Sequence, residues 1–337
     1  MSSERKPLLV GLPAAIDRLN RAARIVITTH QRSDGDALGS VAAMQRVLRA
    51  RGKQATAYLH EQIPERYRFM SDIEPLAVWG PDAPKIVADA DLLLVLDTCA
   101  AVQLGPMAEA IRAAKLPKLA IDHHLTRDDI VDEAHVDVSA AACTQILTKL
   151  FDQAGWPIDA STATHLYVGL ATDTGWFRFS NAGSAAYATA ARLIHAGVRP
   201  NELYERLFLC EFPARARLIG AIMSSFELLC DDRLAVIKLT NAMLKASGAN
   251  RSMTEDIINE PMRIASVVAC AMLVEPEGDD PVRISLRSKR DLDVAALAAK
   301  WGGGGHARAA GAKIKGAFNP VCDDVVRALT AEMDAMK

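Results

Sequence analysis

Three side chains that can bind metal follow one another in the stretch Asp122-His123-His124, directly after the strand-like run Lys118 to Ile121. Short apolar runs of this kind are typical of buried strands. Such strands do not usually end in a carboxylate and two imidazoles in a row. Taken alone, the pattern fits a capped strand end with a surface histidine pair as well as it fits a functional site. A functional site is favoured only if other strand ends supply matching groups.

Matching groups follow two further predicted strands, at residues 24–29 and 91–96, and also occur in neighbouring loops. Strands that alternate with helices predict a parallel, doubly wound sheet, which binds ligands outside the carboxyl ends of its strands. We therefore expect these groups to meet at one edge of one sheet. The set comprises His30, Asp34, Asp36, Asp97, Asp122, His123, His124 and Asp173.

Five carboxylates and three imidazoles in one cleft indicate bound cations. Neighbouring carboxylates raise one another's pKa values, so five of them cannot all stay ionised without positive charge nearby. Four ligating carboxylates carry about four negative charges, which two divalent ions neutralise. Mixed histidine and aspartate ligation without a thiolate suits Mn²⁺ or Mg²⁺, with Co²⁺, Fe²⁺ and Zn²⁺ as alternatives. We expect Mn²⁺.

Two divalent ions about 3.5–4 Å apart clamp both oxygens of a phosphoryl displacement and lower the pKa of a bound water. The expected reaction is therefore hydrolysis of a phosphoester or a phosphoanhydride. Asp97, on the middle candidate strand, is the natural bridge between the ions. Gly35 and Gly39 suit a tight turn into a helix whose N-terminus favours phosphate.

The arrangement of elements along the 337 residues predicts two α/β domains. Strands and helices alternate through residues 1–181, residues 182–229 have a helical pattern, and a second α/β segment occupies residues 230–337. We predict a doubly wound, mostly parallel catalytic domain, a helical linker and a smaller α/β substrate-binding domain. The active site is expected in the cleft between the two domains.

Composition excludes several classes of protein. The formal net charge is -2, so no global basic field attracts long nucleic acid. No apolar run approaches the ~18 residues that span a membrane, and the first residues form a poor signal peptide. The six cysteines are far apart and mostly lie in apolar contexts, which indicates buried thiols in a reducing compartment. We expect a cytoplasmic protein.

Four motifs resemble, in order, those of the DHH phosphoesterases: His30-x-x-x-Asp34-x-Asp36, Asp97, Asp122-His123-His124 and Thr172-Asp173-Thr174-Gly175. The run Gly302 to His306, followed by Ala309-Ala310-Gly311, is similar to that of the associated DHHA1 domain. Ser33 stands where the family typically has proline. By domain content and length, the chain looks like the small bifunctional nanoRNases and pAp phosphatases, which use Mn²⁺.

The resemblance implies distinct roles for the eight residues. One metal ion would be held by His30, Asp34 and Asp97. The other would be held by Asp36, Asp97, His123 and Asp173. His124 would be a catalytic group beside the substrate phosphate. Asp122 would support catalysis by orienting a neighbouring histidine.

Candidate substrate-binding residues lie mostly in the second domain. Four successive glycines allow positive φ angles and a close approach of backbone N–H groups to an anion. Basic residues at strand ends suit either solvent or a pocket for the non-scissile end of a nucleotide. The set comprises Arg178, Arg263, Arg287, Ser288, Lys289, Gly303, Gly304, Gly305 and His306. Trp176 and Phe177 are interpreted chiefly as core residues, with base stacking as the alternative.

Together with these patterns, the resemblance implies a metal-dependent hydrolase that acts on oligonucleotides of about 2–5 nucleotides and on 3′-phosphoadenosine 5′-phosphate (pAp), not on long nucleic acid or membranes. Alternatives in the same class are a cyclic or linear dinucleotide phosphodiesterase and a pyrophosphatase or exopolyphosphatase. The alternative in another class is a non-catalytic nucleotide-binding regulator, although such a protein should have lost metal ligands. The sequence does not decide whether the substrate is RNA or DNA, from which end it is attacked, or whether the protein is a monomer or a homodimer.

Overall fold

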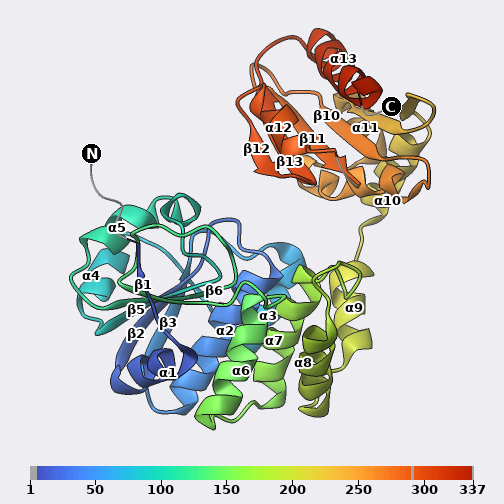
Figure 1. Ribbon diagram of the computed structural model, residues 1–337. Helices are drawn as coiled ribbons and strands as arrows, with labels where there is room; N and C mark the ends of the chain where they lie inside the picture. The colour runs from blue at the N-terminus through green and yellow to red at the C-terminus, as the bar shows by residue number, and fades with distance from the viewer. Residues whose placement is uncertain (1–5, 290–291, 336–337) are drawn as a thin grey trace. The chain divides into compact units, whose positions relative to one another are not determined.

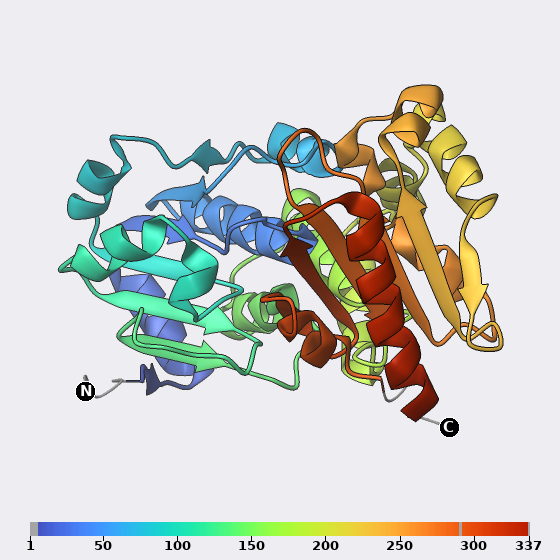
Figure 2. The same ribbon diagram turned by 90° about the horizontal axis from the view of Figure 1, so that it is seen from above.

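The computed structural model describes residues 6–289 and 292–335. The chain forms two compact units that divide between Cys210 and Glu211 (Figure 1). Each unit contains one sheet with helices on both faces, as Figure 1 and Figure 2 show.

The sheet of the first unit has seven strands in the order β1-β7-β6-β5-β2-β3-β4, and every pairing is parallel. The central strand β5 is fully buried along its length, as expected for a strand covered on both faces. The prediction of a doubly wound parallel sheet is confirmed. The strands are β1 (Leu8–Leu9), β2 (Arg24–Thr28), β3 (Gln54–Leu59), β4 (Ala77–Val78), β5 (Leu92–Leu96), β6 (Lys118–Asp122) and β7 (Glu133–Val136).

Alternate residues of these strands supply two separate cores. Leu92 and Leu94 join the larger core, whereas Leu93 and Val95 join the smaller core, because successive side chains of a strand point to opposite faces. The larger core involves α1 (Leu12–Arg21), α2 (Gly35–Ala50), α3 (Arg68–Ile73), α6 (Cys143–Ala154), α7 (Ala160–Asp173), α8 (Ser184–His195) and α9 (Pro200–Phe208). The smaller core involves α4 (Ala83–Ala88) and α5 (Met107–Ala113).

Helices α2 and α7 approach each other closely at glycines. A Cβ atom on Gly39 would lie 2.4 Å from the carbonyl oxygen of His165, and one on Gly35 would lie 2.3 Å from Oγ1 of Thr172. Neither glycine forms the tight turn expected from the sequence, because Gly35 is the first residue of α2 and Gly39 lies in its second turn. The small residues instead bring together the two helices that carry Asp36 and Asp173.

The second unit has a mixed six-stranded sheet in the order β12-β13-β11-β10-β9-β8, in which only the β9–β10 pairing is parallel. Helices α12 (Val294–Ala299) and α13 (Phe318–Ala335) contribute to one core, and α10 (Pro213–Met223) and α11 (Asn241–Ser247) to another. The strands are β8 (Glu227–Leu229), β9 (Leu234–Leu239), β10 (Ala269–Val274), β11 (Val282–Ser288), β12 (Gly304–His306) and β13 (Ala309–Ile314).

The segment predicted as a helical linker, residues 182–229, contains three helices and one strand. The helical prediction is wrong for Glu227–Leu229, which pairs antiparallel with β9 through a turn whose residues Cys230, Asp231 and Asp232 have positive φ angles. Helices α8 and α9 contribute to the core of the first unit, and α10 to a core of the second. The division into residues 1–181, 182–229 and 230–337 stays a prediction. No helix in the described ranges is long and apolar enough to cross a membrane.

Candidate metal centre

The predicted metal ligands converge at the carboxyl edge of the first sheet. Strands β2, β5 and β6 are neighbours and run parallel, so the residues that follow them emerge at the same edge. The first turn of α2 and the last residue of α7 reach this edge as well. The structure therefore brings together all six predicted ligands, namely His30, Asp34, Asp36, Asp97, His123 and Asp173.

Asp97 lies between the two predicted metal positions. Its Oδ2 atom is 3.4 Å from Nε2 of His30, and its Oδ1 atom is 3.4 Å from Nε2 of His123. The side chain is buried, and Oδ1 has no hydrogen-bond donor among the described residues. A buried carboxylate oxygen without a donor fits a ligand that turns one oxygen toward each of two cations.

The backbone of Asp97 is strained, with a φ angle of 62°. Non-glycine residues rarely adopt left-handed backbone conformations, although aspartate and asparagine tolerate them better than most. Strain of this kind persists where the surrounding structure imposes it, as it commonly does at functional sites. Here the turn after β5 places the carboxylate between His30 and His123.

Two sets of donor atoms contain the residues of the two predicted ion sites, except that the second set lacks Asp97. His30, Asp34 and Asp97 form one set, and in each set all the donor atoms lie within 4.8 Å of one another. Asp36, His123 and Asp173 form the other, in which Nε2 of His123 is 3.9 Å from Asp36 and 3.7 Å from Asp173. A third set combines His124 with Asp97 and His123. The residues present thus fit two divalent cations.

Backbone carbonyl groups orient both predicted histidine ligands. Nδ1 of His30 lies 2.9 Å from the carbonyl oxygen of Gln31, and Nδ1 of His123 lies 3.2 Å from that of Ala140. If Nδ1–H donates in each case, Nε2 is the nitrogen left for metal binding. In both rings, Nε2 is the atom that faces the carboxylates.

Asp122 fixes the positions of His123 and His124 through hydrogen bonds. Its Oδ1 atom accepts hydrogen bonds from the backbone N–H groups of His123 and His124, at 2.8 and 3.1 Å. The same oxygen lies 2.8 Å from Nδ1 of His124. Nε2 of His124 remains available, and 38% of this side chain is exposed. The geometry supports a substrate-facing role for His124 and an orienting role for Asp122.

The loop of the first motif is stiffened by hydrogen bonds. Ser33, which replaces the proline typical of the family, is buried and donates its hydroxyl to the carbonyl oxygen of His30 at 2.9 Å. Asp34 caps α2 by accepting from the backbone N–H groups of Asp36 and Ala37. The Ser33 hydroxyl therefore restrains the loop where proline would do so through its ring.

Asp36 has a structural partner that the sequence did not reveal. Its carboxylate accepts hydrogen bonds from the backbone N–H groups of Cys143 and Thr144, at 2.5 and 3.0 Å, and from the Thr144 hydroxyl at 2.6 Å. It thus caps α6, whose own N-cap residue, Ala142, provides no side-chain hydrogen bond. The sequence offers one signal for this contact: the predicted helix at 141–154 begins without a capping residue of its own, so a side chain from elsewhere must cap it.

Replacing Thr144 with valine is expected to weaken Mn²⁺ binding by about 10- to 100-fold, because Asp36 loses the hydroxyl that orients it. Calorimetric titration of metal-free protein with Mn²⁺ measures the change. Thr144→Ser should restore the affinity. Thr148→Val is the matched control, because this buried hydroxyl one turn later donates only to the carbonyl oxygen of Thr144. Equal affinities for Thr144→Val and the wild type would contradict this role.

Charges within the centre shift the pKa values of its residues. Burial lowers the pKa of both histidines, but neighbouring carboxylates outweigh it and raise the pKa of His30 to about 9 and that of His123 to about 10. Burial, Asp97 and Asp34 raise the pKa of Asp173 to about 6 against the effect of His123. Burial opposes the two histidines at Asp97, whose pKa nevertheless falls to about 2. In metal-free protein at neutral pH, both imidazoles therefore carry protons.

Metal binding is expected to release at least two protons at pH 7, because a histidine ligand must be neutral and both His30 and His123 are protonated at that pH. Since the pKa values of His30 and His123 are raised, Mn²⁺ affinity should increase as pH rises from 6 to 9. The slope should be up to about 100-fold per pH unit for two protons. Calorimetry in buffers of different ionisation enthalpy counts the protons. His30→Gln should reduce the count by about one, and binding without proton release would contradict the prediction.

The predicted substrate-binding residues are distributed over both units. Arg178 is exposed in the first unit, where its Nε donates to the carbonyl oxygen of Gly175. In the second unit, Ser288 is buried and donates its hydroxyl to the carbonyl oxygens of Leu292 and Ala307, which indicates a structural role. Lys289 donates its Nζ to the carbonyl oxygen of Ile264.

The two arginines and three glycines predicted to bind substrate in the second unit have different surroundings. Arg263 is 79% exposed and pairs with Glu260, and Arg287 donates to the carbonyl oxygen of Leu286. A Cβ atom at Gly303 or Gly305 would collide with the backbone of β13, whereas Gly304 has open space around it. Packing thus explains two of the glycines. His306 belongs to β12, and its side chain lies outside what the structure describes.

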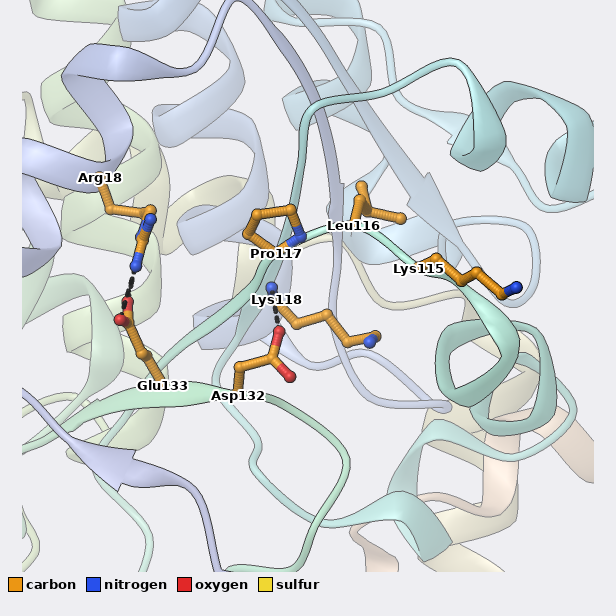
Figure 3. A pocket seen from close by; sticks show the side chains of 7 residues that line it. All are labelled: Arg18, Lys115, Leu116, Pro117, Lys118, Asp132 and Glu133. Atoms are coloured by element: carbon orange, nitrogen blue, oxygen red, sulfur yellow. Dashed lines mark hydrogen bonds and ion pairs between the residues drawn. The ribbon is translucent and has the colours of Figure 1, made fainter.

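A hollow of about 490 Å³ lies away from the metal centre (Figure 3). It is lined by the starts of β6 and β7, which are the amino ends of the strands. Arg18 forms an ion pair with Glu133 at 2.6 Å, and Asp132 accepts from the backbone N–H of Lys118. One ion pair therefore occupies part of its lining, and ligands of parallel sheets bind at the opposite edge.

Comparison with known proteins shows two family matches and close relatives. Residues 24–170 match the DHH family, N-terminal domain, and residues 232–335 match the DHHA1 domain. The bifunctional oligoribonuclease and PAP phosphatase NrnA of Thermus thermophilus is 32% identical over 297 residues, which cover 87% of this chain and 84% of that protein. The protein of the same name from Bacillus subtilis is 27% identical, and the match covers 86% of this chain and 89% of that protein.

A solved structure shares the fold over nearly the whole chain. It is an exopolyphosphatase-related protein from Bacteroides fragilis, with a TM-score of 0.89 and 24% sequence identity. The match covers 96% of this chain and 95% of that one.

Proposed function

The chain belongs to the DHH family, with the family's N-terminal domain followed by a DHHA1 domain, and we propose that it hydrolyses short oligonucleotides and pAp. The substrates are oligonucleotides of about 2–5 nucleotides, since the chain has no broad positive charge for longer nucleic acid. The products are mononucleotides from oligonucleotides, and AMP with inorganic phosphate from pAp. Two relatives that carry both activities in their names support this assignment.

One observation carries the chemistry: each carboxylate oxygen of Asp97 faces the histidine of a different donor set, at 3.4 Å. When bound, a pair of divalent ions lowers the pKa of a water molecule and neutralises the charge of a phosphate. We propose that His30, Asp34 and Asp97 hold one ion, and that Asp36, Asp97, His123 and Asp173 hold the other. Mn²⁺ suits these ligands best.

His124 hydrogen-bonds a non-bridging phosphate oxygen through Nε2, which Asp122 leaves available by engaging Nδ1. The pKa of His124 is raised, first by the Asp122 carboxylate, so the ring keeps its proton to higher pH than a free imidazole does. A protonated ring can stabilise the negative charge that builds up on the phosphate as its ester bond breaks. His124 thus supplies positive charge while Asp122 fixes the ring orientation.

We further propose that the DHHA1 domain binds the part of the substrate that is not cleaved. Exposed Arg263 and the open position of Gly304 support this role better than Ser288, whose hydroxyl is used internally. We also propose that the protein is located in the cytoplasm.

Ranking of substrates tests the function directly. The protein is incubated with Mn²⁺ and end-labelled RNA of two to about twenty nucleotides, and separately with pAp, cyclic dinucleotides and polyphosphate. We expect the highest rates on the shortest RNAs and on pAp. Faster cleavage of cyclic dinucleotides or polyphosphate would favour the corresponding phosphodiesterase or exopolyphosphatase, and binding without turnover would favour a regulator.

A further inference from the structure

We propose that the exposed ring of Phe179 is a stacking platform for the nucleobase of the nucleotide whose phosphate occupies the metal centre. This inference rests on the proposed function and adds a base subsite to it. The platform belongs to the loop that follows Asp173, the last residue of α7.

The loop after α7 has an unusual backbone. Gly175, Trp176 and Phe177 have φ angles of 56°, 58° and 62°, so three successive residues are left-handed. Two of them are bulky aromatic residues, which rarely adopt this conformation. The chain then turns back, and the N–H groups of Arg178 and Phe179 both donate to the carbonyl oxygen of Thr174 at 3.0 Å. Strained loops of this kind are concentrated at ligand sites.

Trp176 and Phe177 anchor the loop and are not themselves open to a base. Trp176 has ring contacts with Tyr167, Tyr204 and Phe208, at centroid separations of 6.0, 5.2 and 5.4 Å. Phe177 has ring contacts with Tyr167 and Tyr187, at 5.9 and 5.3 Å. Both are half-buried against the core. The core interpretation of these two residues is therefore favoured over base stacking.

Phe179 differs from these anchors because its residue is 56% exposed. The far end of its ring covers Gly175, where an added Cβ atom would lie 2.4 Å from Cζ of the ring. Only glycine allows the ring to rest there. The backbone thus supports one side of the ring and leaves the rest open. A rigidly held, exposed aromatic ring suits base stacking, which requires only a flat π surface.

The loop is tied to the metal centre at both ends. The side-chain amide of Asn181 donates to the carbonyl oxygens of Asp173 and Ala141, both at 3.2 Å. Ala140, the residue before Ala141, accepts from the ring of His123. Phe179 therefore sits on backbone that also positions two predicted metal ligands. A base on this ring would belong to a nucleotide whose phosphate lies at those ligands.

Arg178 adds positive charge to the platform. Its Nε donates to the carbonyl oxygen of Gly175 at 2.7 Å, and the side chain is exposed. An aromatic face suits the base of a nucleotide, and a guanidinium group and a metal centre on adjoining backbone suit its charged phosphates. A purely apolar partner would not require the charge, which favours a nucleotide as the occupant.

The test compares pAp with ribose 3′,5′-bisphosphate, which keeps both phosphates and lacks the base. Phe179→Ala and Phe179→Leu should raise KM for pAp by about 5- to 100-fold, with kcat nearly unchanged. Phe179→Tyr should retain most of the affinity. Kinetics on the base-free compound should be the same for all variants. Phe212→Ala, which removes another phenylalanine of 57% exposure outside this loop, is the matched control.

A second measurement does not require turnover. Phe179→Trp places an indole on the platform, and 5′-AMP should quench its emission while ribose 5-phosphate should not. Quenching by AMP in a protein that hydrolyses neither RNA nor pAp would uphold the base subsite and reject the proposed function. Equal losses of Phe179→Ala on pAp and on the base-free compound would overturn the base subsite. A change in the oligomeric state of Phe179→Ala on gel filtration would also overturn the base subsite, because the ring would then contact a second copy of the chain.

Discussion

Replacing Asp97 with asparagine is expected to reduce metal-dependent hydrolysis by about 1,000-fold or more while the protein stays folded. Both carboxylate oxygens are used, one toward His30 and one toward His123. Asparagine keeps the size of the side chain but loses its charge and one of its acceptor oxygens. It also tolerates the φ angle of 62° better than alanine does. The expected loss therefore reflects the chemistry of the centre and not its backbone.

Two measurements check this prediction. Initial rates on pAp give the loss of activity, and calorimetric titration with Mn²⁺ should show that the number of bound ions falls below two. Asp256→Asn is the matched control, because Asp256 has the same φ angle of 62° and lies in the second unit, outside the metal centre. The control should retain wild-type rates. An Asp97→Asn variant with wild-type activity would sink the two-metal mechanism.

Replacing Gly39 with alanine is expected to destabilise the first unit by about 3 kcal/mol, although alanine is normally the better helix former. The new Cβ atom would lie 2.4 Å from the backbone carbonyl oxygen of His165, and backbone cannot move aside as a flexible side chain can. Helices α2 and α7 must separate to relieve the collision. Because these helices carry Asp36 and Asp173, Mn²⁺ affinity should fall as well.

Urea denaturation, followed by circular dichroism, measures the stability change, and titration with Mn²⁺ measures the affinity. Gly220→Ala makes the same substitution at an exposed position of helix α10, where nothing lies within 4 Å of the new atom. That control should be neutral or stabilising by up to about 1 kcal/mol. If Gly39→Ala matched the control in both measurements, the close approach of α2 and α7 would not be what positions the ligands.

The predictions for Asp97 and Gly39 concern the same feature, namely how the helices and strand ends are held around the charged side chains of the metal centre. The metal-free centre balances that charge with protons, since His30 and His123 have raised pKa values. Burial, together with Asp97 and Asp173, raises the pKa of Asp36 against the effect of His123. Divalent cations would replace these protons. Metal binding would therefore exchange protons for cations at this centre.

The clustering of the proposed metal ligands could be predicted from the sequence because it depends on two local regularities. Apolar runs such as 91–96 identify strands, and parallel strands deliver the residues that follow them to one edge. Once His30, Asp97 and His123 are placed after adjacent strands, their proximity follows from topology. The family motifs added the remaining ligands on α2 and α7, which periodicity alone does not place at that edge.

Contacts between segments far apart in the chain were decided only by the tertiary structure. Thr144 supports Asp36 across 108 positions, and Gly39 is required by the carbonyl oxygen of His165. The strand Glu227–Leu229 forms because β9 offers it a partner, although its sequence resembles the end of a helix. Phe179 differs from Trp176 only in what surrounds each ring. Residue type and spacing determine which groups can bind metal, whereas packing determines which side chains support those groups and which stay open to a substrate.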